Sequence, residues 1–259
     1  MKSVKVDLSS ELKNIELHVF ADWHIGDAHC DMSAIKKDIE KVSRTSNAFC
    51  ILNGDLCNTA TKTSVSDIYS ETMSPMKQIK TCVELLTPIK DKILFITTGN
   101  HENRIAKQDG IDLMRIVARE LGLEDRYNAE GGVLFLRFGI QKRRYSVQKK
   151  QVYSLYITHG SGGGKKEGGK INRLADLAGI VDVDIYVVAH THLPAAFRES
   201  FYRLSWQNNS ISIVDKLFVN TAAKLKYGGY GQLQGFKPAS KVNPVIYLNG
   251  TKREFDAKV

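Results

Sequence analysis

The amino-acid sequence predicts an α/β fold, in which helices pack against buried β-sheets. A chain of 259 residues with 42% hydrophobic and 25% charged side chains is long and apolar enough to form a sizeable core. Short apolar runs rich in β-branched residues alternate with segments of helical periodicity, which is the pattern of layered α/β proteins. The same composition excludes a disordered chain, a collagen-like repeat and a disulfide-dense miniprotein.

The individual elements follow from the period of the apolar residues. Strands are predicted over five apolar runs, at 15–21, 48–53, 92–98, 152–158 and 184–189. Helices are predicted where apolar residues recur every three or four positions, over 32–42, 76–86, 112–120 and 170–177. The second of these helices follows the start signal Ser74-Pro75, and the third ends near Gly122.

The other predicted strands are antiparallel or lie near the C-terminus. Residues 133–140 and 145–158 have the pattern of a hairpin, joined by a basic turn at 141–144. Further strands are predicted at 210–219 and 245–248, with Gly-rich turns nearby. Because the chain has no linker-like stretch, low-complexity tract or internal repeat, we expect residues 1–259 to form a single domain.

Positive charge is concentrated in one segment. The chain has 37 Lys and Arg against 28 Asp and Glu, a net charge of +9. Residues 137–173 contain a single acid, Glu167, and ten basic residues: Arg137, Lys142, Arg143, Arg144, Lys149, Lys150, Lys165, Lys166, Lys170 and Arg173. This segment therefore carries the whole excess, which indicates a local anionic partner.

The sequence favours a cytoplasmic protein without a membrane partner. The N-terminus lacks the apolar region of a signal peptide, and no apolar run approaches the roughly 20 residues that span a bilayer. The four cysteines form no CxxC pair, so we expect reduced thiols.

Metal-binding residues follow each of the five predicted buried strands. A single histidine at a strand end is commonly structural, but here the pattern repeats at five strand ends. Because the carboxyl ends of strands in α/β sheets line a common crevice, these side chains are expected to converge. Imidazole and carboxylate ligands suit Zn, Mn, Fe or Co, and seven ligands suit two ions sharing a carboxylate. The seven are Asp22, His24, Asp55, Asn100, His159, His190 and His192, with His101 as an additional imidazole.

The same residues resemble a known family. The blocks D-x-H at 22–24, G-D at 54–55, G-N-H-E at 99–102, T-H-G at 158–160 and A-H-T-H at 189–192 look like the signature of calcineurin-like metallophosphoesterases, in the nuclease or phosphodiesterase branch. The resemblance implies a four-layer α/β/β/α sandwich of two mixed sheets flanked by helices, with residues 193–259 completing the second sheet. One departure is Ala189, where the family usually has Gly.

The resemblance also implies roles for individual residues. Asp22, His24 and His192 would hold one ion. Asn100, His159 and His190 would hold the other, with Asp55 bridging the two. The ions would be divalent transition metals, with Mn expected first and Fe, Zn, Co or Ni as alternatives. His101 would be a catalytic residue that contacts the phosphate and protonates the leaving oxygen.

This centre predicts a phosphoesterase in which a metal-bridging hydroxide attacks phosphorus. Arg104 could clamp a phosphate oxygen, although a solvated arginine at the start of a helix is the alternative. The Gly-rich segment after His159 carries Lys165, Lys166 and Lys170, and we expect a basic flap there. Together with the turn at 141–144, this flap would form a cationic rim around the cleft.

The rim favours a polyanionic substrate, so the first hypothesis is hydrolysis of phosphodiester bonds in DNA, RNA or a nucleotide-like diester. The second is a phosphomonoesterase for a small phosphate or a phosphoprotein, using the same metals. A third is a non-catalytic scaffold on the same fold, against which the intact ligand set argues. The sequence leaves the oligomeric state open.

Overall fold

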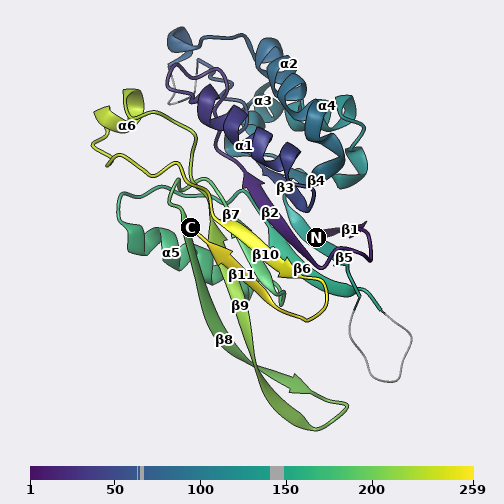
Figure 1. Cartoon of the computed structure of the whole chain (residues 1–259). Coiled ribbons are helices and arrows are strands. Elements are labelled where there is room, and N and C mark those ends of the chain that lie inside the picture. The colour runs from purple at the N-terminus through teal and green to yellow at the C-terminus, as the bar shows by residue number, and fades with distance from the viewer. Residues whose placement is uncertain (63, 65–66, 141–148) are drawn as a thin grey trace.

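The computed structural model describes residues 1–62, 64, 67–140 and 149–259, and the basic turn predicted at 141–144 lies outside the described residues. Two mixed β-sheets pack face to face, and helices cover their outer faces, as Figure 1 shows. The predicted α/β fold with its α/β/β/α layers is therefore confirmed.

The larger sheet has six strands and the smaller has five. In spatial order the larger contains β1 (Lys2–Asp7), β5 (Gly132–Phe138), β6 (Gln151–Ile157), β7 (Ile185–Val188), β9 (Ser210–Asn220) and β8 (Ala195–Ser205). The smaller contains β11 (Phe255–Lys258), β10 (Val245–Asn249), β2 (Asn14–Phe20), β3 (Ala48–Asn53) and β4 (Ile93–Thr97). The chain after residue 193 thus adds strands to both sheets.

The helices lie mostly in the first half of the chain. The α-helices are α1 (Met32–Arg44), α2 (Pro75–Leu86), α3 (Asn100–Asp109), α4 (Leu113–Glu120), α5 (Glu167–Ala175) and α6 (Gly229–Leu233). Short 3₁₀ segments lie at Ile68–Ser70, Thr87–Lys92, Glu124–Arg126 and Asp176–Gly179. In the described part of the chain, no helix is long and apolar enough to cross a membrane.

Helix boundaries follow local capping chemistry. The carboxylate of Asp31 accepts a hydrogen bond of 3.2 Å from the Ala34 N–H at the start of α1, and Asp112 accepts one of 3.0 Å from Arg115 N–H in α4. Helix α2 begins at Pro75, as the sequence predicts. Helix α3 ends at Gly110, whose φ of 71° would be strained for a residue with a Cβ.

Three apolar clusters hold the layers together. The inner cluster lies between the sheets and draws side chains from both, such as Leu17 and Ile51 of the smaller sheet and Leu155 of the larger. A second cluster lies between the smaller sheet and helices α1, α2 and α4. The third lies under α5, where Leu174 meets the outer face of the larger sheet. The central strands of each sheet are therefore buried on both faces, which explains their continuous apolar runs.

The predicted strands at 15–21, 48–53, 92–98, 152–158 and 184–189 correspond to β2, β3, β4, β6 and β7. The structure also contains β1, α3 and β8, which the apolar period did not predict. Helix α3 has the sequence NHENRIAKQD, in which Ile105 is the buried hydrophobic residue, so no apolar stripe marks it. Helix α5 begins at Glu167, three residues before the predicted start, because two glycines obscure its first turn.

Candidate metal centre

The strands that precede the predicted ligands all end at the same side of the two sheets. In the smaller sheet β2, β3 and β4 are parallel neighbours, so the loops carrying Asp22, Asp55 and Asn100 leave it together. In the larger sheet β6 and β7 are parallel, and they lead to His159 and to the loop at 190–192. Ligands from both sheets therefore face one another across the edge of the sandwich.

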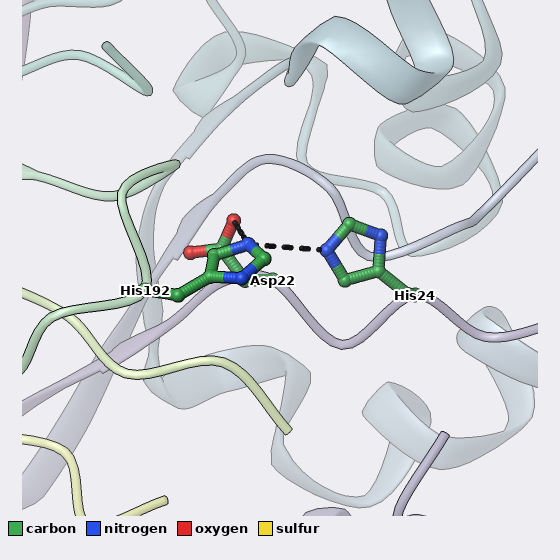
Figure 2. A group of neighbouring side chains, drawn as sticks. All are labelled: Asp22, His24 and His192. Carbon is green, nitrogen blue, oxygen red and sulfur yellow. Dashed lines mark hydrogen bonds and ion pairs between the residues drawn. The ribbon is translucent and has the colours of Figure 1, made fainter. Parts of the chain in front are cut away.

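Asp22, His24 and His192 form one group, with ligand atoms that all lie within 4.8 Å of one another. Figure 2 shows the ring of His192 between the other two side chains. Its Nε2 is 3.3 Å from Asp22 Oδ1 and 3.4 Å from His24 Nε2. The Asp22 carboxylate and the His24 ring are almost fully buried, whereas His192 is partly exposed.

Asp55, His159 and His190 form a second group of the same size. His159 Nε2 lies 3.1 Å from Asp55 Oδ2 and 3.2 Å from Asn100 Oδ1, so the amide of Asn100 joins this group. Asp55 also belongs to a third set, with His24 and His101, and its Oδ2 is 3.8 Å from His101 Nε2. The Asp55 carboxylate therefore lies between the two groups.

The backbone of the ligand loops is strained. Non-glycine residues rarely adopt a positive φ, and each one costs about 1–3 kcal/mol. Five predicted ligands adopt it: Asp22 at 51°, His24 at 51°, Asp55 at 51°, His190 at 65° and His192 at 54°. Backbone hydrogen bonds from Asp22 N–H to Gly54 O (3.1 Å) and from His24 N–H to Asp55 O (3.0 Å) lock two of these loops together.

Backbone carbonyls orient two of the imidazoles. His159 Nδ1 is 2.7 Å from the carbonyl oxygen of Asn53, and His101 Nδ1 is 2.9 Å from that of Asn58. Because a carbonyl oxygen only accepts, each Nδ1 carries the proton and donates it. Each Nε2 is then directed toward the carboxylate of Asp55, in the arrangement that metal-site histidines commonly show.

Burial and the two carboxylates set the charges of the site. Burial lowers the pKa of His24 to about 3 and also lowers the pKa of His101 and of His190. Burial opposes the charge of His159 as well, but the carboxylates of Asp55 and Asp22 outweigh it and raise the pKa of that ring to about 10. Neighbouring imidazoles overcome burial at Asp22 and Asp55 and hold the pKa of both carboxyls low.

These residues fit divalent transition-metal ions. Neutral imidazoles, ionised carboxylates and an amide oxygen are the ligands that such ions prefer. Asp22 Oδ1 is buried and, within the described residues, has the ion pair with His192 Nε2 at 3.3 Å but no hydrogen bond of good geometry, an environment that a cation would suit. A bound cation would also replace the proton that the two carboxylates attract to His159.

Glu102 supports the candidate site in a way that the apolar and ligand patterns of the sequence do not predict. It is 1% exposed, and its carboxylate accepts hydrogen bonds from three backbone N–H groups, those of Asp55 (3.0 Å), Cys57 (2.9 Å) and Gly99 (3.0 Å). Burial, reinforced by the charge of Asp55, raises its pKa to about 7. The available signal was its place three residues after Gly99, where a carboxylate can bond back to the start of a helix.

The predicted substrate-binding residues occupy different environments. Arg104 lies on α3, and its buried Nη1 has no hydrogen-bond partner among the residues that the structure describes. Lys165 and Lys166 are exposed. Lys170 Nζ instead donates a 2.7 Å hydrogen bond to the carbonyl oxygen of Thr191, between two predicted ligands. Lys170 therefore supports the ligand loop rather than pointing freely into solvent.

Two cations of the basic segment lie away from the ligand cluster, while the turn at 141–144 that would complete the predicted rim lies outside the described residues. Arg137 and Lys150 both lie within ion-pair distance of Asp7, 3.1 Å and 3.5 Å away, where β5 ends and β6 begins. His159 follows the other end of β6, which has seven residues and so spans about 23 Å. These two cations therefore do not line the ligand cluster, although they are close in sequence to those that follow His159.

Comparison with known proteins gives one family. A family model described as calcineurin-like phosphoesterase matches residues 22–194, which include all of the predicted ligands. No curated protein matches the chain.

Several solved structures resemble the chain, all at low identity. A Streptococcus pneumoniae protein described as a predicted phosphoesterase is 14% identical, with a TM-score of 0.37 over 95% of this chain and 90% of that one. Vacuolar protein sorting 29 from Cryptosporidium parvum is 14% identical, with a TM-score of 0.45 over 95% and 96% of the two chains. Wild-type Vps29 from Entamoeba histolytica, complexed with Zn²⁺, is 13% identical, with a TM-score of 0.43 over 93% and 89%.

Proposed function

The chain belongs to the calcineurin-like phosphoesterase family, and from this premise we propose that it hydrolyses phosphodiester bonds in nucleic acids or nucleotide-like diesters. The observation that carries the proposal is the pair of ligand groups placed on either side of the Asp55 carboxylate. A shared carboxylate is the usual means of holding two metal ions close enough to act on one phosphate.

In this proposal Asp22, His24 and His192 hold one ion. Asn100, His159 and His190 hold the other, and Asp55 bridges them. When bound, the ions neutralise the phosphate charge and lower the pKa of a water molecule, so that a nucleophile is available near neutral pH. The metal could be Mn, Fe, Zn, Co or Ni, since each accepts this set of nitrogen and oxygen ligands.

His101 is the candidate for protonating the leaving oxygen. Its Nδ1 proton is committed to the carbonyl oxygen of Asn58, so the proton given to the leaving oxygen would be a second one, carried on Nε2 of the imidazolium. The His101 side chain keeps 16% of its surface exposed, whereas that of Asp55 keeps 1%. The imidazole is therefore accessible to a substrate, while the bridging carboxylate is enclosed.

Exposed lysines in the loop that follows His159 support a diester of a polyanion over a small monoester. Lys165 and Lys166 lie in the loop that follows His159 and precedes α5. Gly160, Gly162 and Gly164 in this loop have positive φ values of 92°, 88° and 146°. Cations at this place can contact phosphates that flank the scissile bond, which exist in a polymer and not in a small monoester.

A substrate panel tests the proposed function. The purified protein would be chelated, reloaded with Mn²⁺, and assayed on an aryl diester, the matching monoester, single- and double-stranded DNA, RNA and cyclic nucleotides. We expect turnover of diesters, with the polymers preferred. Strong monoester turnover with negligible diester turnover would contradict the diester assignment, and no turnover of any ester would support a scaffold.

The role of the exposed lysines has its own test. Replacing Lys165 and Lys166 with Ala is expected to raise KM for DNA or RNA and to flatten its salt dependence, because each lost phosphate contact lowers the salt slope by about one. Replacing Lys36 and Lys37, exposed on α1, is the matched control. If both pairs of substitutions change KM equally, or if activity on a small aryl diester falls as much as activity on nucleic acid, Lys165 and Lys166 do not bind the substrate.

A further inference from the structure

A two-stranded arm projects from the larger sheet. Strands β8 and β9 pair over their whole length, from Ala195–Asn220 to Ser205–Ser210. Strand β9 pairs with β7 only over Leu217–Asn220, so residues 200–215 form a ribbon of two strands, here called the arm. Figure 1 shows the arm extending away from the layers of the fold.

One face of the arm is apolar and exposed. Tyr202 stands opposite Ile213, and Leu204 stands opposite Ile211, so these four side chains share a face of the ribbon. Their exposed fractions are 80%, 66%, 54% and 66%. Trp206, at the start of the turn, is 84% exposed. These five residues are called the arm patch below.

The arm patch continues the inner face of the sheet. Leu217 and Val219 belong to the same face of β9, and both are buried between the two sheets. The opposing sheet stops at β11, where Arg198 donates hydrogen bonds to Phe255 O and to Asp256. Beyond this contact the larger sheet extends past the smaller one. The inner face of β8 and β9 is therefore exposed to solvent along the arm, where no opposing strand covers it in the described part of the chain.

The arm patch is at or above the upper end of the apolar patches found on typical monomers. An exposed aromatic side chain contributes about 150–250 Å² of apolar surface and an exposed aliphatic one about half as much, so the patch offers roughly 500–700 Å². The largest apolar patch on a typical monomer is about 300–600 Å², and larger ones generally mark an interaction surface.

Both charged residues of the arm lie outside the arm patch, which limits the kind of partner. Asp215 accepts a 2.6 Å hydrogen bond from Ser200 Oγ, and Arg203 forms an ion pair of 3.0 Å with Asp182. The arm patch itself carries no charge. Nucleic acid, an anionic membrane or a strongly charged protein would find no complementary charge there. An equally neutral β-face would fit it.

We propose that the arm patch is the contact between two copies of this chain, which pack these faces of their arms together about a two-fold axis. A two-fold contact uses the same patch on both copies, and the flat face of a β-ribbon can pack on its own equivalent. Two patches would bury roughly 1,000–1,400 Å² in total, above the roughly 1,000 Å² expected of a specific interface. The contact needs no metal and is independent of the proposed reaction.

Light scattering coupled to size-exclusion chromatography tests the mass in solution. We expect a dimer at about 100 µM chain, the range in which an interface of this size is populated. Leu204→Lys with Ile213→Lys places two charges in the contact, and this variant is expected to be monomeric. Ser210→Lys with Ser212→Lys adds the same charge to the opposite face of the arm and is expected to remain dimeric.

Tryptophan fluorescence provides a second measurement. The chain has two tryptophans, and Trp23 is fully buried, so Trp206 reports on the arm. On concentration, the emission of the unmodified protein is expected to shift to shorter wavelength and to become less accessible to iodide. The Trp206→Phe variant should show neither change.

Three outcomes would overturn the proposal. The first is a monomeric wild type at about 100 µM, the range in which this interface should be populated. The second is a dimer that survives Leu204→Lys with Ile213→Lys. The third is a blue shift of the monomer's tryptophan emission on phosphatidylglycerol vesicles, which would make the patch a membrane contact. Circular dichroism of each variant confirms that it is folded, and all substituted side chains are solvent-exposed.

Discussion

The predicted metal ligands stand on backbone conformations that most residues avoid. A φ near 50° is found at Asp22, Asp55 and His192. Glycine adopts this conformation without strain, but it has no side chain that could bind a metal. Surrounding hydrogen bonds hold the backbone in these conformations. One example is the 3.1 Å hydrogen bond that His190 N–H donates to Asp22 Oδ2. The identity of these residues is visible in the sequence, whereas their conformation depends on neighbours that are distant in the chain.

His101 offers a test that separates catalysis from metal binding. Its Nε2 lies 3.8 Å from Asp55 Oδ2, and its ring packs at 4.4 Å between centroids against that of His24. His101→Ala is expected to keep two metal ions per chain and to lower turnover of a diester about 10²–10⁴-fold, because a positioned proton donor is lost. Metal analysis and steady-state kinetics measure the two quantities. Unchanged turnover would remove His101 from the reaction.

Lys170 offers a test that separates positioning from substrate contact. Its hydrogen bond to Thr191 O holds the loop between His190 and His192, so Lys170→Met is expected to weaken metal affinity about 10–100-fold. Titration calorimetry with Mn²⁺ measures this affinity without substrate. Lys165→Met, on an exposed side chain, is the control. If Lys170→Met leaves metal affinity intact and raises only KM, the lysine contacts substrate instead.

At the scale of elements, one buried carboxylate joins two loops and a helix. Glu102 belongs to the first turn of α3, yet its partners include the backbone of Asp55 and Cys57 in the loop after β3. Asp55, the predicted bridging ligand, and the start of α3 are therefore fixed relative to each other by a carboxylate whose hydrogen bonds go to backbone N–H groups. Such outer partners of ligands commonly control the geometry of a metal site.

Replacing Glu102 is therefore expected to lower the free energy of unfolding, because its main contacts are structural. Glu102→Leu leaves three buried N–H groups without an acceptor, and we expect the free energy of unfolding to fall by about 3 kcal/mol or more. Glu102→Gln keeps one acceptor oxygen and should lose less. Urea unfolding of the metal-free protein measures both. Equal stability of the three proteins would show that the hydrogen bonds contribute nothing.

Strand direction decides which parts of the basic segment can act together. Arg137 and Lys150 lie at one end of the β5–β6 hairpin, and His159 follows the other end. Both residues are close in sequence to the lysines after His159, but each residue of an extended strand adds about 3.3 Å, so they lie at the far end of β6 from His159. Strand length also explains why β8 and β9 extend beyond the smaller sheet. The apolar pattern of the sequence does not predict this extension.

At the scale of the whole molecule, the ligand cluster spans both sheets. Asp22, Asp55 and Asn100 come from loops of the smaller sheet, and His159 and His190 from loops of the larger. The inner apolar cluster holds the sheets together along their length, and the ligands meet at one edge. Ions bound there would cross-link the two halves of the sandwich.

Removing metal is therefore expected to lower the thermal stability of the whole fold. A ligand at 100 times its Kd stabilises by about 2.7 kcal/mol per site, and for a domain of this size 1 kcal/mol shifts Tm by about 2–4 °C. With two sites occupied, we expect chelation to lower Tm by roughly 10–20 °C and Mn²⁺ to restore it. Asp55→Asn should respond far less. Identical Tm values with and without chelator would contradict a metal centre at this edge.

The sequence by itself determined the central strands of both sheets, most of the helices and the predicted metal ligands. These features are local, since apolar period marks an element and a ligand directly follows its strand, as Asp22 follows β2 and His159 follows β6. Only the tertiary structure decided that Lys170 supports the ligand loop, that Glu102 connects α3 to Asp55, and that Arg137 lies away from the site. Each of these depends on the direction and length of strands that bring distant segments together, which local patterns do not encode.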